Sequence, residues 1–187
     1  FIGSATEGRN AAIVYLAGDV GGGEAGFEQS LSATLQLNTR YTLSVDVGNI
    51  ASGTGLPPSD VLGFFNLDGF PGYRIDLLAG STVIASDNNT LGSIPEGEFR
   101  TSTIFADIGS SHLQAGQNLM IRLVNLNIPG TPEAPGIEVD FDDVILTATA
   151  IPEPSSLAAV TGAVLAAGAF ARRLHQNQKR TSRSWQS

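Results

Sequence analysis

The sequence predicts an all-β fold, in which residues 1–150 form a β-sandwich and one hydrophobic helix follows at the C-terminal end. Glycine supplies 22 of the 187 residues, and glycine weakens helix interiors while providing the conformations that tight turns need. Several short segments alternate apolar and polar residues, which is the period of a strand with one buried face. The part before residue 151 shows no helical periodicity, so we expect about eight strands separated by Gly, Pro and Asn turns.

The first half of this region contains the clearest strand. We expect earlier strands at residues 11–17 and 26–31, where apolar and β-favouring residues lie between glycine-rich stretches. In residues 40–48, one side of the strand is apolar and the other is polar. The side chains expected to face the core from this strand are Tyr41, Leu43, Val45 and Val47.

The second half predicts further strands in a regular succession. Residues 72–87 are interpreted as two strands joined by a turn at Ala79-Gly80-Ser81. The remaining strands are expected at residues 98–106, 117–126 and 137–150, and Leu119, Ile121 and Leu123 of the second of these point inward.

Two long loops are too rich in Gly and Pro for regular structure: residues 49–72 and 127–136. Long loops on a rigid sandwich are where binding residues usually occur. An apolar ligand site is therefore expected in the first loop, and its alternative is a hydrophobic plug that simply fills the space under the loop. The residues that would line either one are Phe64, Phe65, Phe70 and Tyr73.

The charge balance excludes one class of partner. Up to residue 151 the chain holds 17 acidic residues, five arginines and no lysine. Such a surface repels nucleic-acid phosphates, so we expect no nucleic-acid binding. The same carboxylates are suited to divalent cations, although acidic residues also serve simply to keep a protein soluble.

No catalytic set is recognisable, and we expect a protein that is not an enzyme. The chain has no cysteine, so a disulfide framework and a thiolate site are excluded. His112 is the sole histidine before residue 151, and its glycine- and serine-containing surroundings are typical of a surface turn. Ser111 beside it makes no catalytic pair, because nucleophile, base and an orienting third residue must meet in space.

The C-terminal region is different in composition. The 17 residues from Ser155 to Ala171 carry no charge, and as a helix they would span about 26 Å, close to the thickness of a bilayer core. Arg172 and Arg173 follow, and further basic residues after them predict a cytoplasmic C-terminus with the acidic body on the outer side. The alternative is a buried core helix, which would have no need of a basic cluster.

The order of these features resembles the PEP-CTERM sorting signal over about residues 151–180: Pro152, Glu153 and Pro154 precede the apolar segment and the arginine pair. The resemblance implies that an exosortase recognises the three-residue motif and that Arg172 and Arg173 stop transfer through the membrane. It also implies export to the cell envelope or extracellular matrix of a Gram-negative-type bacterium, with an inner-membrane anchor before sorting. The chain begins at Phe1 without a Met and without the charged, apolar and small-residue succession of a signal peptide, so we expect that an N-terminal piece is missing.

Residues 27–49, 73–87 and 139–148 resemble galactose-binding-like jelly rolls, the fold of many carbohydrate-binding modules. The resemblance implies a structural Ca²⁺ held by Asp140, Asp142 and Asp143. Ca²⁺ takes six to eight oxygens, and strand alternation places Asp140 and Asp142 on one face, so Asp143 either needs a bulge or points inward. The alternative is that these carboxylates are solvated or bonded to backbone amides.

Together these observations predict an exported surface or matrix protein whose sandwich associates with extracellular polysaccharide without catalysis. The alternative is a structural or self-associating envelope protein that binds no glycan. The aromatic residues favour this alternative, because the only tryptophan is Trp185 in the tail, and sugar sites commonly stack a ring on Trp or Tyr.

Overall fold

The computed structural model describes residues 6, 8, 10–17, 23–55, 61, 63–128 and 136–152. Within these residues it contains ten strands and no α-helix. The strands are β1 (Ala12–Ala17), β2 (Ala25–Thr34), β3 (Thr39–Asn49), β4 (Gly53–Thr54), β5 (Phe64–Phe65), β6 (Tyr73–Ala79), β7 (Thr82–Asn88), β8 (Glu98–Ile108), β9 (Asn118–Asn125) and β10 (Gly136–Ala150). The all-β prediction is therefore confirmed for the described part of the chain.

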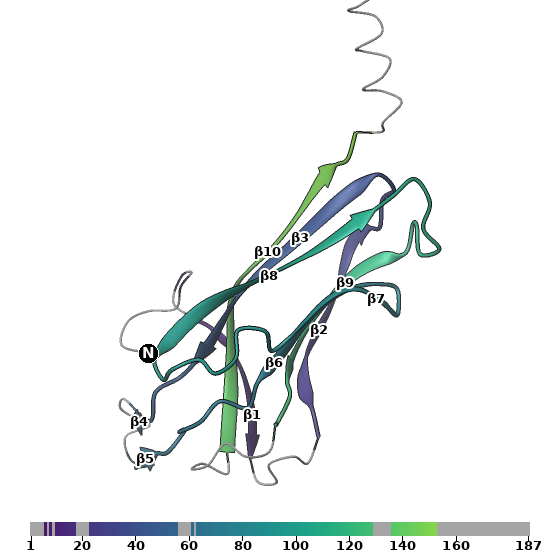
Figure 1. The fold of residues 1–187 in the computed structure, drawn as a ribbon. Helices are drawn as coiled ribbons and strands as arrows, with labels where there is room; N and C mark the ends of the chain where they lie inside the picture. Colours follow the sequence, from purple (N-terminus) through teal and green to yellow (C-terminus); the bar gives the residue numbers. More distant parts are fainter. Residues whose placement is uncertain are drawn as a thin grey trace, which may run out of the picture. The chain divides into compact units, whose positions relative to one another are not determined.

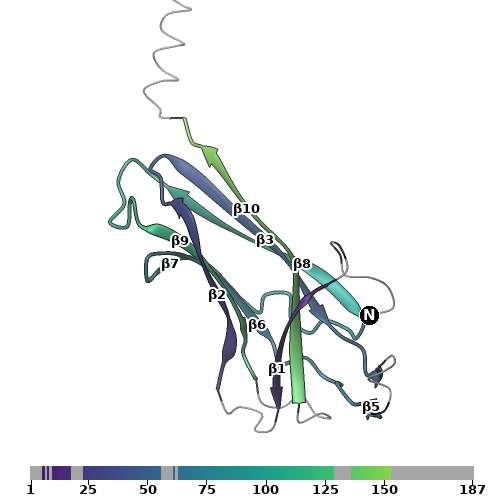
Figure 2. The same ribbon diagram turned by 180° about the vertical axis from the view of Figure 1, so that it is seen from behind.

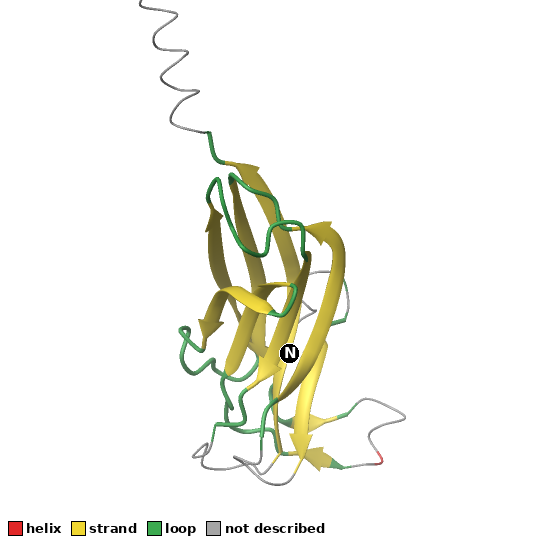
Figure 3. Ribbon diagram, turned by 90° about the vertical axis from the view of Figure 1, so that its right-hand side faces the viewer, coloured by secondary structure: helices red, strands yellow, loops and turns green. Residues whose placement is uncertain are grey.

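Eight of the strands form two four-stranded sheets that face each other (Figures 1 and 3). The orders are β1-β10-β3-β8 in one sheet and β2-β9-β6-β7 in the other, and every strand pair with a recorded register is antiparallel. Successive strands mostly alternate between the sheets, which is the double Greek-key path of a jelly roll. The short strands β4 and β5 pair separately, in the loop that follows β3.

The core lies between the two sheets. The four side chains of β3 predicted to face inward, Tyr41, Leu43, Val45 and Val47, are all buried. The facing sheet contributes side chains such as Ile75 and Leu77 of β6 and Leu119 of β9 to the same cluster. Fully burying one such aliphatic side chain stabilises the fold by about 1.5–3 kcal/mol, so the alternation of β3 accounts for its central position.

The turn between β6 and β7 also matches its prediction. Gly80 has a φ of 58°, a left-handed conformation that glycine adopts without the steric cost of a Cβ. Its amide donates a hydrogen bond to the Asn118 carbonyl oxygen at 2.8 Å, which ties the turn to the start of β9.

A polar cluster links the two sheets through the core. Asp87 of β7 accepts hydrogen bonds from the Tyr73 hydroxyl on β6 and from the Ser102 hydroxyl on β8, and the Thr90 amide donates to its other oxygen at 2.9 Å. Burial alone would raise the pKa of Asp87, but these hydrogen bonds outweigh it and lower that pKa below its ordinary value. The carboxylate therefore stays ionised, and it joins β7 of one sheet to β8 of the other.

Strand β10 runs between β1 and β3, and Figures 1 and 2 both show its first half beside β1. Residues 136–141 pair with β1 in register, from Gly136 opposite Ala17 to Phe141 opposite Ala12. Asp143 then adopts a φ of 45°, which is outside the strand region. The regular strand conformation is therefore interrupted at Asp143.

The chain divides into a unit of residues 1–149 and a second unit of residues 150–187. The predicted C-terminal helix, with Glu153, Pro154, Arg172 and Arg173, lies outside the described residues. In the part of the chain that the structure does describe, no helix is long and apolar enough to cross a membrane.

Candidate active site

Two buried carboxyl groups lie side by side on β10. Glu138 is 2% exposed and Asp140 is fully buried, and both lie on the face opposite Val139 and Phe141, which pack in the core. Residues two apart in a strand point to the same side, so the strand itself holds the two carboxyl groups next to each other.

The neighbouring strand places exposed apolar side chains beside these acids. In the register of β1 and β10, Tyr15 lies opposite Glu138 and Ile13 lies opposite Asp140. Directly opposed residues share a face, so all four side chains belong to the same face of the sheet. Tyr15 is 54% exposed and Ile13 is 47% exposed. An aromatic ring and an aliphatic side chain that solvent reaches therefore border two acids that solvent does not reach.

The two carboxyl groups lack well-formed hydrogen bonds in the described structure. None of the four oxygens of Glu138 and Asp140 accepts a hydrogen bond of normal geometry from any described residue. Burying an unpaired ionised carboxylate is costly, and proteins relieve that cost by holding the proton instead.

The pKa values of the two acids follow from this burial. Burial, with the charge of Asp140 second, raises the pKa of Glu138 to about 8. Burial also raises the pKa of Asp140 to about 6, although the Ile50 amide lies near enough to lower both pKa values in part. At a pH between these two values Glu138 keeps its proton and Asp140 is ionised, so the pair holds one proton. Such a pair contains a proton donor and an anion together, which is the arrangement that general acid catalysis uses.

The structure separates the four aromatic residues predicted to form an apolar ligand site. Phe64 and Phe65 form β5 and are 68% and 42% exposed. Phe70 and Tyr73 are buried, and their ring centroids lie 6.4 Å apart. Tyr73 and Phe70 therefore belong to the core, as the alternative of a hydrophobic plug expected, whereas Phe64 and Phe65 remain available at the surface.

The three aspartates predicted to bind calcium do not form a cation site within the described residues. Asp142 is half-buried and accepts a hydrogen bond from the Thr6 hydroxyl at 3.0 Å, and Asp143 has the left-handed conformation described above. No group of three or more Asp, Glu, His or Cys side chains in the described ranges is placed to hold a metal ion. The unpaired oxygens of Glu138 and Asp140 suit a cation, but two carboxyl groups fall short of the six to eight oxygens of Ca²⁺.

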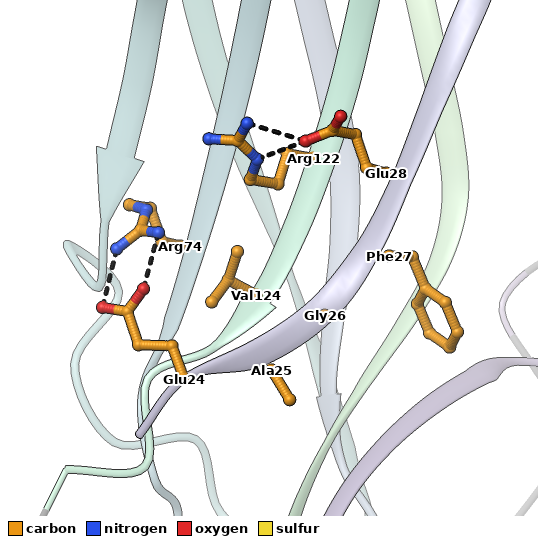
Figure 4. Close-up of a pocket in the computed structure, with 8 residues that line it drawn as sticks. All are labelled: Glu24, Ala25, Gly26, Phe27, Glu28, Arg74, Arg122 and Val124. Atoms are coloured by element: carbon orange, nitrogen blue, oxygen red, sulfur yellow. Dashed lines mark hydrogen bonds and ion pairs between the residues drawn. The ribbon is translucent and has the colours of Figure 1, made fainter.

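A groove lies on the outer face of the other sheet, and its chemistry differs from that of the acid pair (Figure 4). This groove has a volume of about 350 Å³. Arg74 pairs with Glu24 at 2.7 Å and Arg122 pairs with Glu28 at 2.7 Å, while Phe27 points away from both pairs. The hydrogen bond with Arg74 lowers the pKa of Glu24, so this carboxylate stays ionised and holds no proton to donate. The groove is therefore a poor candidate for acid catalysis.

Sequence reasoning named Asp140 but missed Glu138. The signal was present, because an acidic residue two positions before Asp140 must share its face in any regular strand. What the pattern does not show is which strand lies beside β10 and what covers its outer face, and these decide whether the carboxyl groups are buried. The residues of the groove in Figure 4 were also not predicted, because their pairing depends on the register of three strands.

Comparison with known proteins identifies the family. Residues 1–147 match the family model described as HpiC1-like, HpiC1 cyclase. The crystal structure of the Stig cyclase Fisc from Fischerella sp. TAU, in complex with (3Z)-3-(1-methyl-2-pyrrolidinylidene)-3H-indole, is 46% identical, with a TM-score of 0.66 over 80% of this chain and 68% of that one. A cyclase from Fischerella sp. TAU in complex with 4-(1H-indol-3-yl)butan-2-one is 45% identical, with a TM-score of 0.68 over 82% of this chain and 70% of that one. No curated protein matches. The matches place this β-sandwich with buried acids in a class of enzymes, the cyclases. The chain belongs to the HpiC1-like cyclase family.

This finding corrects several predictions. The identification as a PEP-CTERM protein is wrong, because the match over residues 1–147 is to a cyclase family and nothing in the comparisons supports a sorting signal at Pro152, Glu153 and Pro154. The predictions of exosortase and extracellular polysaccharide as partners, and of a protein without catalysis, are wrong for the same reason. The tail motif was specific in form, but it does not bear on the chemistry of the body.

Glu138→Gln tests the burial of this acid through stability. The folded state keeps the Glu138 proton up to about pH 8, whereas the unfolded chain releases it near the ordinary value of about 4.3, so the wild type loses stability as pH rises between these values. The variant has no proton to lose there, and its free energy of unfolding should rise relative to wild type by on the order of 3 kcal/mol from pH 5 to pH 8. Urea unfolding of the full chain at both pH values measures this difference.

The matched control is Glu98→Gln, which changes an exposed glutamate on β8. Its difference from wild type should be nearly independent of pH. An equal pH dependence in the two variants would contradict the assignment of a buried, protonated Glu138.

Proposed function

We propose that this chain is a cyclase that acts on an indole-bearing small molecule, and that the Glu138–Asp140 pair supplies the proton that starts ring closure. The observation that carries the proposal is the pair of buried carboxyl groups without hydrogen-bond partners in the described structure. The family match supports the reaction class, and the indole compounds bound to the Fischerella cyclases support the substrate class.

The chemistry follows from the protonation of the pair. An O–H bond of the pair breaks as a C–H bond forms at an electron-rich carbon of the substrate, such as one of the indole ring or of an alkene. The positive charge so created is stabilised by the carboxylate that remains, because the site is poor in water and the Coulomb attraction is weakly screened there. An internal π bond then attacks the cation and closes the ring. Loss of a proton returns it to the carboxylate, so that the sequence is a net isomerisation.

The exposed neighbours of the pair suit this substrate class. Tyr15 offers an aromatic face beside Glu138, and offset stacking with an indole ring is favourable. Ile13 beside Asp140 adds apolar surface without a nucleophile that would capture the cation. Positioning by these two side chains brings the reacting carbon to the acid, and holding reactants in place lowers the barrier.

The variants Glu138→Gln and Asp140→Asn test the proposal. Each retains the size of the side chain but removes one half of the acid and anion pair, and loss of a positioned acid costs about 10²–10⁴-fold in rate. We expect turnover of an indole-bearing alkene, followed by mass spectrometry and product chromatography, to fall by at least about 100-fold in each variant. In the wild type, turnover should decline below about pH 6 and above about pH 8, where the pair gains or loses a proton.

The control is again Glu98→Gln, which should retain wild-type turnover. If both pair variants cyclise the substrate at the wild-type rate while the fold is intact by circular dichroism, the assignment of the acid is wrong.

Calcium at Asp140, Asp142 and Asp143 stays a prediction, because the described residues supply too few oxygens on their own. A structural ion binds only the folded state and raises the midpoint of thermal unfolding by mass action. We expect Ca²⁺ to raise the midpoint of the full chain after EDTA treatment, and Asp142→Asn to remove most of that rise. A midpoint that does not respond to Ca²⁺ would contradict the prediction.

The cellular location also remains a prediction. The uncharged residues 155–171 and the arginines after them favour a membrane-attached chain with the cyclase unit on the outer side. Cell fractionation of the full chain and of a chain that ends at Ile151 should find only the former in the membrane fraction. Equal distribution of the two chains would contradict it.

A further inference from the structure

Strand β3 has one outward-facing position without a side chain, and it lies in the sheet that carries the acid pair of Glu138 and Asp140. Outward residues alternate with the core-facing residues of this strand. These outward positions hold Arg40, Thr42, Ser44, Asp46 and Gly48. Gly48 is nevertheless buried, so another part of the chain covers it.

The ring of Phe99 covers Gly48. The two residues lie directly opposite each other in the register of β3 and β8, and directly opposed residues share a face. A Cβ at position 48 would lie less than 3.0 Å from Cδ1, Cε1 and Cζ of the ring. Any side chain larger than that of glycine would therefore displace the ring. Phe99 lies over β3 because Gly48 leaves room for it.

This ring lies at the end of β3 that is beside the acid pair. The sheet order places β3 next to β10, and β1 lies on the other side of β10. Ile50 follows Gly48 by two residues, and its amide lies near both carboxyl groups of the pair. Tyr15 and the acid pair belong to the same outer face as Phe99. The two aromatic side chains therefore lie on opposite sides of the acids.

The width between these two aromatic side chains suits a flat ring. Neighbouring strands lie about 4.8 Å apart, so β1 and β3 lie about 10 Å apart across β10. An aromatic ring that stands over β10 would lie roughly 5 Å from the strand on each side, and aromatic rings interact favourably at centroid distances of about 4.5–7 Å. An indole ring therefore fits between Tyr15 and Phe99 with its electron-rich carbons above the acids.

We propose that Phe99, held over Gly48, is a specificity-determining residue: it forms the second aromatic wall of the cyclase site and, with Tyr15, sets how the indole ring stands over the acid pair. The substrate class rests on the proposed function. Phe99 has no proton to give, so its loss weakens binding and relaxes the orientation of the substrate without removing the acid. The alternative is a structural role, in which the ring only covers the glycine and adds cross-strand packing.

Binding of indole to the full chain, followed by NMR through the amides of Gly48 and Ile50, tests the wall without turnover. In the wild type we expect indole to shift both amide signals. Phe99→Leu keeps apolar volume but removes the aromatic face, and Gly48→Ala keeps the ring but displaces it. Each variant should therefore weaken indole binding by about two- to tenfold.

The matched control is Phe105→Leu, which changes the same residue type on the same face of β8. Phe105 is exposed and lies opposite Thr42, six residues along the strand from Phe99. Its replacement should leave the affinity for indole at the wild-type value. Wild-type affinity in both Phe99→Leu and Gly48→Ala, with the fold intact by circular dichroism, would overturn the wall, as would the absence of indole-induced shifts in the wild type.

Turnover separates this proposal from the proposed function. Phe99→Leu should raise KM and change the ratio of cyclised products, while the pH profile keeps its wild-type shape because both acids are intact. A ring that only covers Gly48 would lower the midpoint of thermal unfolding and leave KM and the product ratio unchanged. If Glu138→Gln retains turnover while Phe99→Leu still binds indole weakly, the acid assignment fails and the wall stands. If Glu138→Gln is inactive while Phe99→Leu binds indole as the wild type does, the wall fails and the acid assignment stands.

Discussion

The alternation of side chains along β10 is the constraint on which the site depends. Val139 and Phe141 must point into the core, because the sandwich closes around them, and the residues between them must then point to the opposite face. Two of those residues are acidic, and both Glu138 and Asp140 are buried there with the Ile50 amide near them. A shift of one residue in the register would place both carboxylates in the core and remove the aliphatic and aromatic residues from it.

This burial has an energetic cost that the rest of the fold must offset. A buried carboxyl group without a hydrogen bond is destabilising, and the described structure contains two such groups on one strand. The contrast with Asp87 is informative, because that aspartate receives hydrogen bonds from Tyr73 and Ser102 and contributes to the attachment of the sheets. A buried carboxyl group therefore stabilises the core where hydrogen-bond donors surround it, as at Asp87, and keeps its proton where such donors are absent. Without hydrogen-bond donors a buried carboxyl group has a raised pKa, and this suits it to act as an acid near neutral pH.

Much of the fold could be predicted from local patterns, but little of the site could. The alternation of residues 40–48 and the turn at Gly80 are local features, and both appear in the structure where they were predicted. The burial of Glu138 depends on which strands lie beside β10, and this is decided by contacts between residues more than 100 positions apart, such as Tyr15 and Glu138. Phe70 and Phe64 are alike in the sequence, yet one packs against Tyr73 and the other is exposed, because the chain turns between them. The prediction of a glycan-associated surface protein failed because it relied on a tail motif and a fold resemblance, and neither describes the chemistry of the body.

The groove of Figure 4 and the Glu138–Asp140 pair differ in how their charges are paired, and this difference indicates the chemistry better than the shape of a pocket does. In the groove on β2, β9 and β6, Arg74 is paired with Glu24 and Arg122 with Glu28, and the lowered pKa of Glu24 leaves it without a proton for transfer. At the acids on β10, burial brings the pKa of Glu138 to about 8 and that of Asp140 to about 6. Formation of a carbocation needs a proton donor and then an anion at the same place, and an acid pair with one shared proton satisfies both needs in turn. Under the proposed function, a β-sandwich without cysteine and with one histidine in its body would obtain the acid for cyclisation by burying two carboxyl groups together.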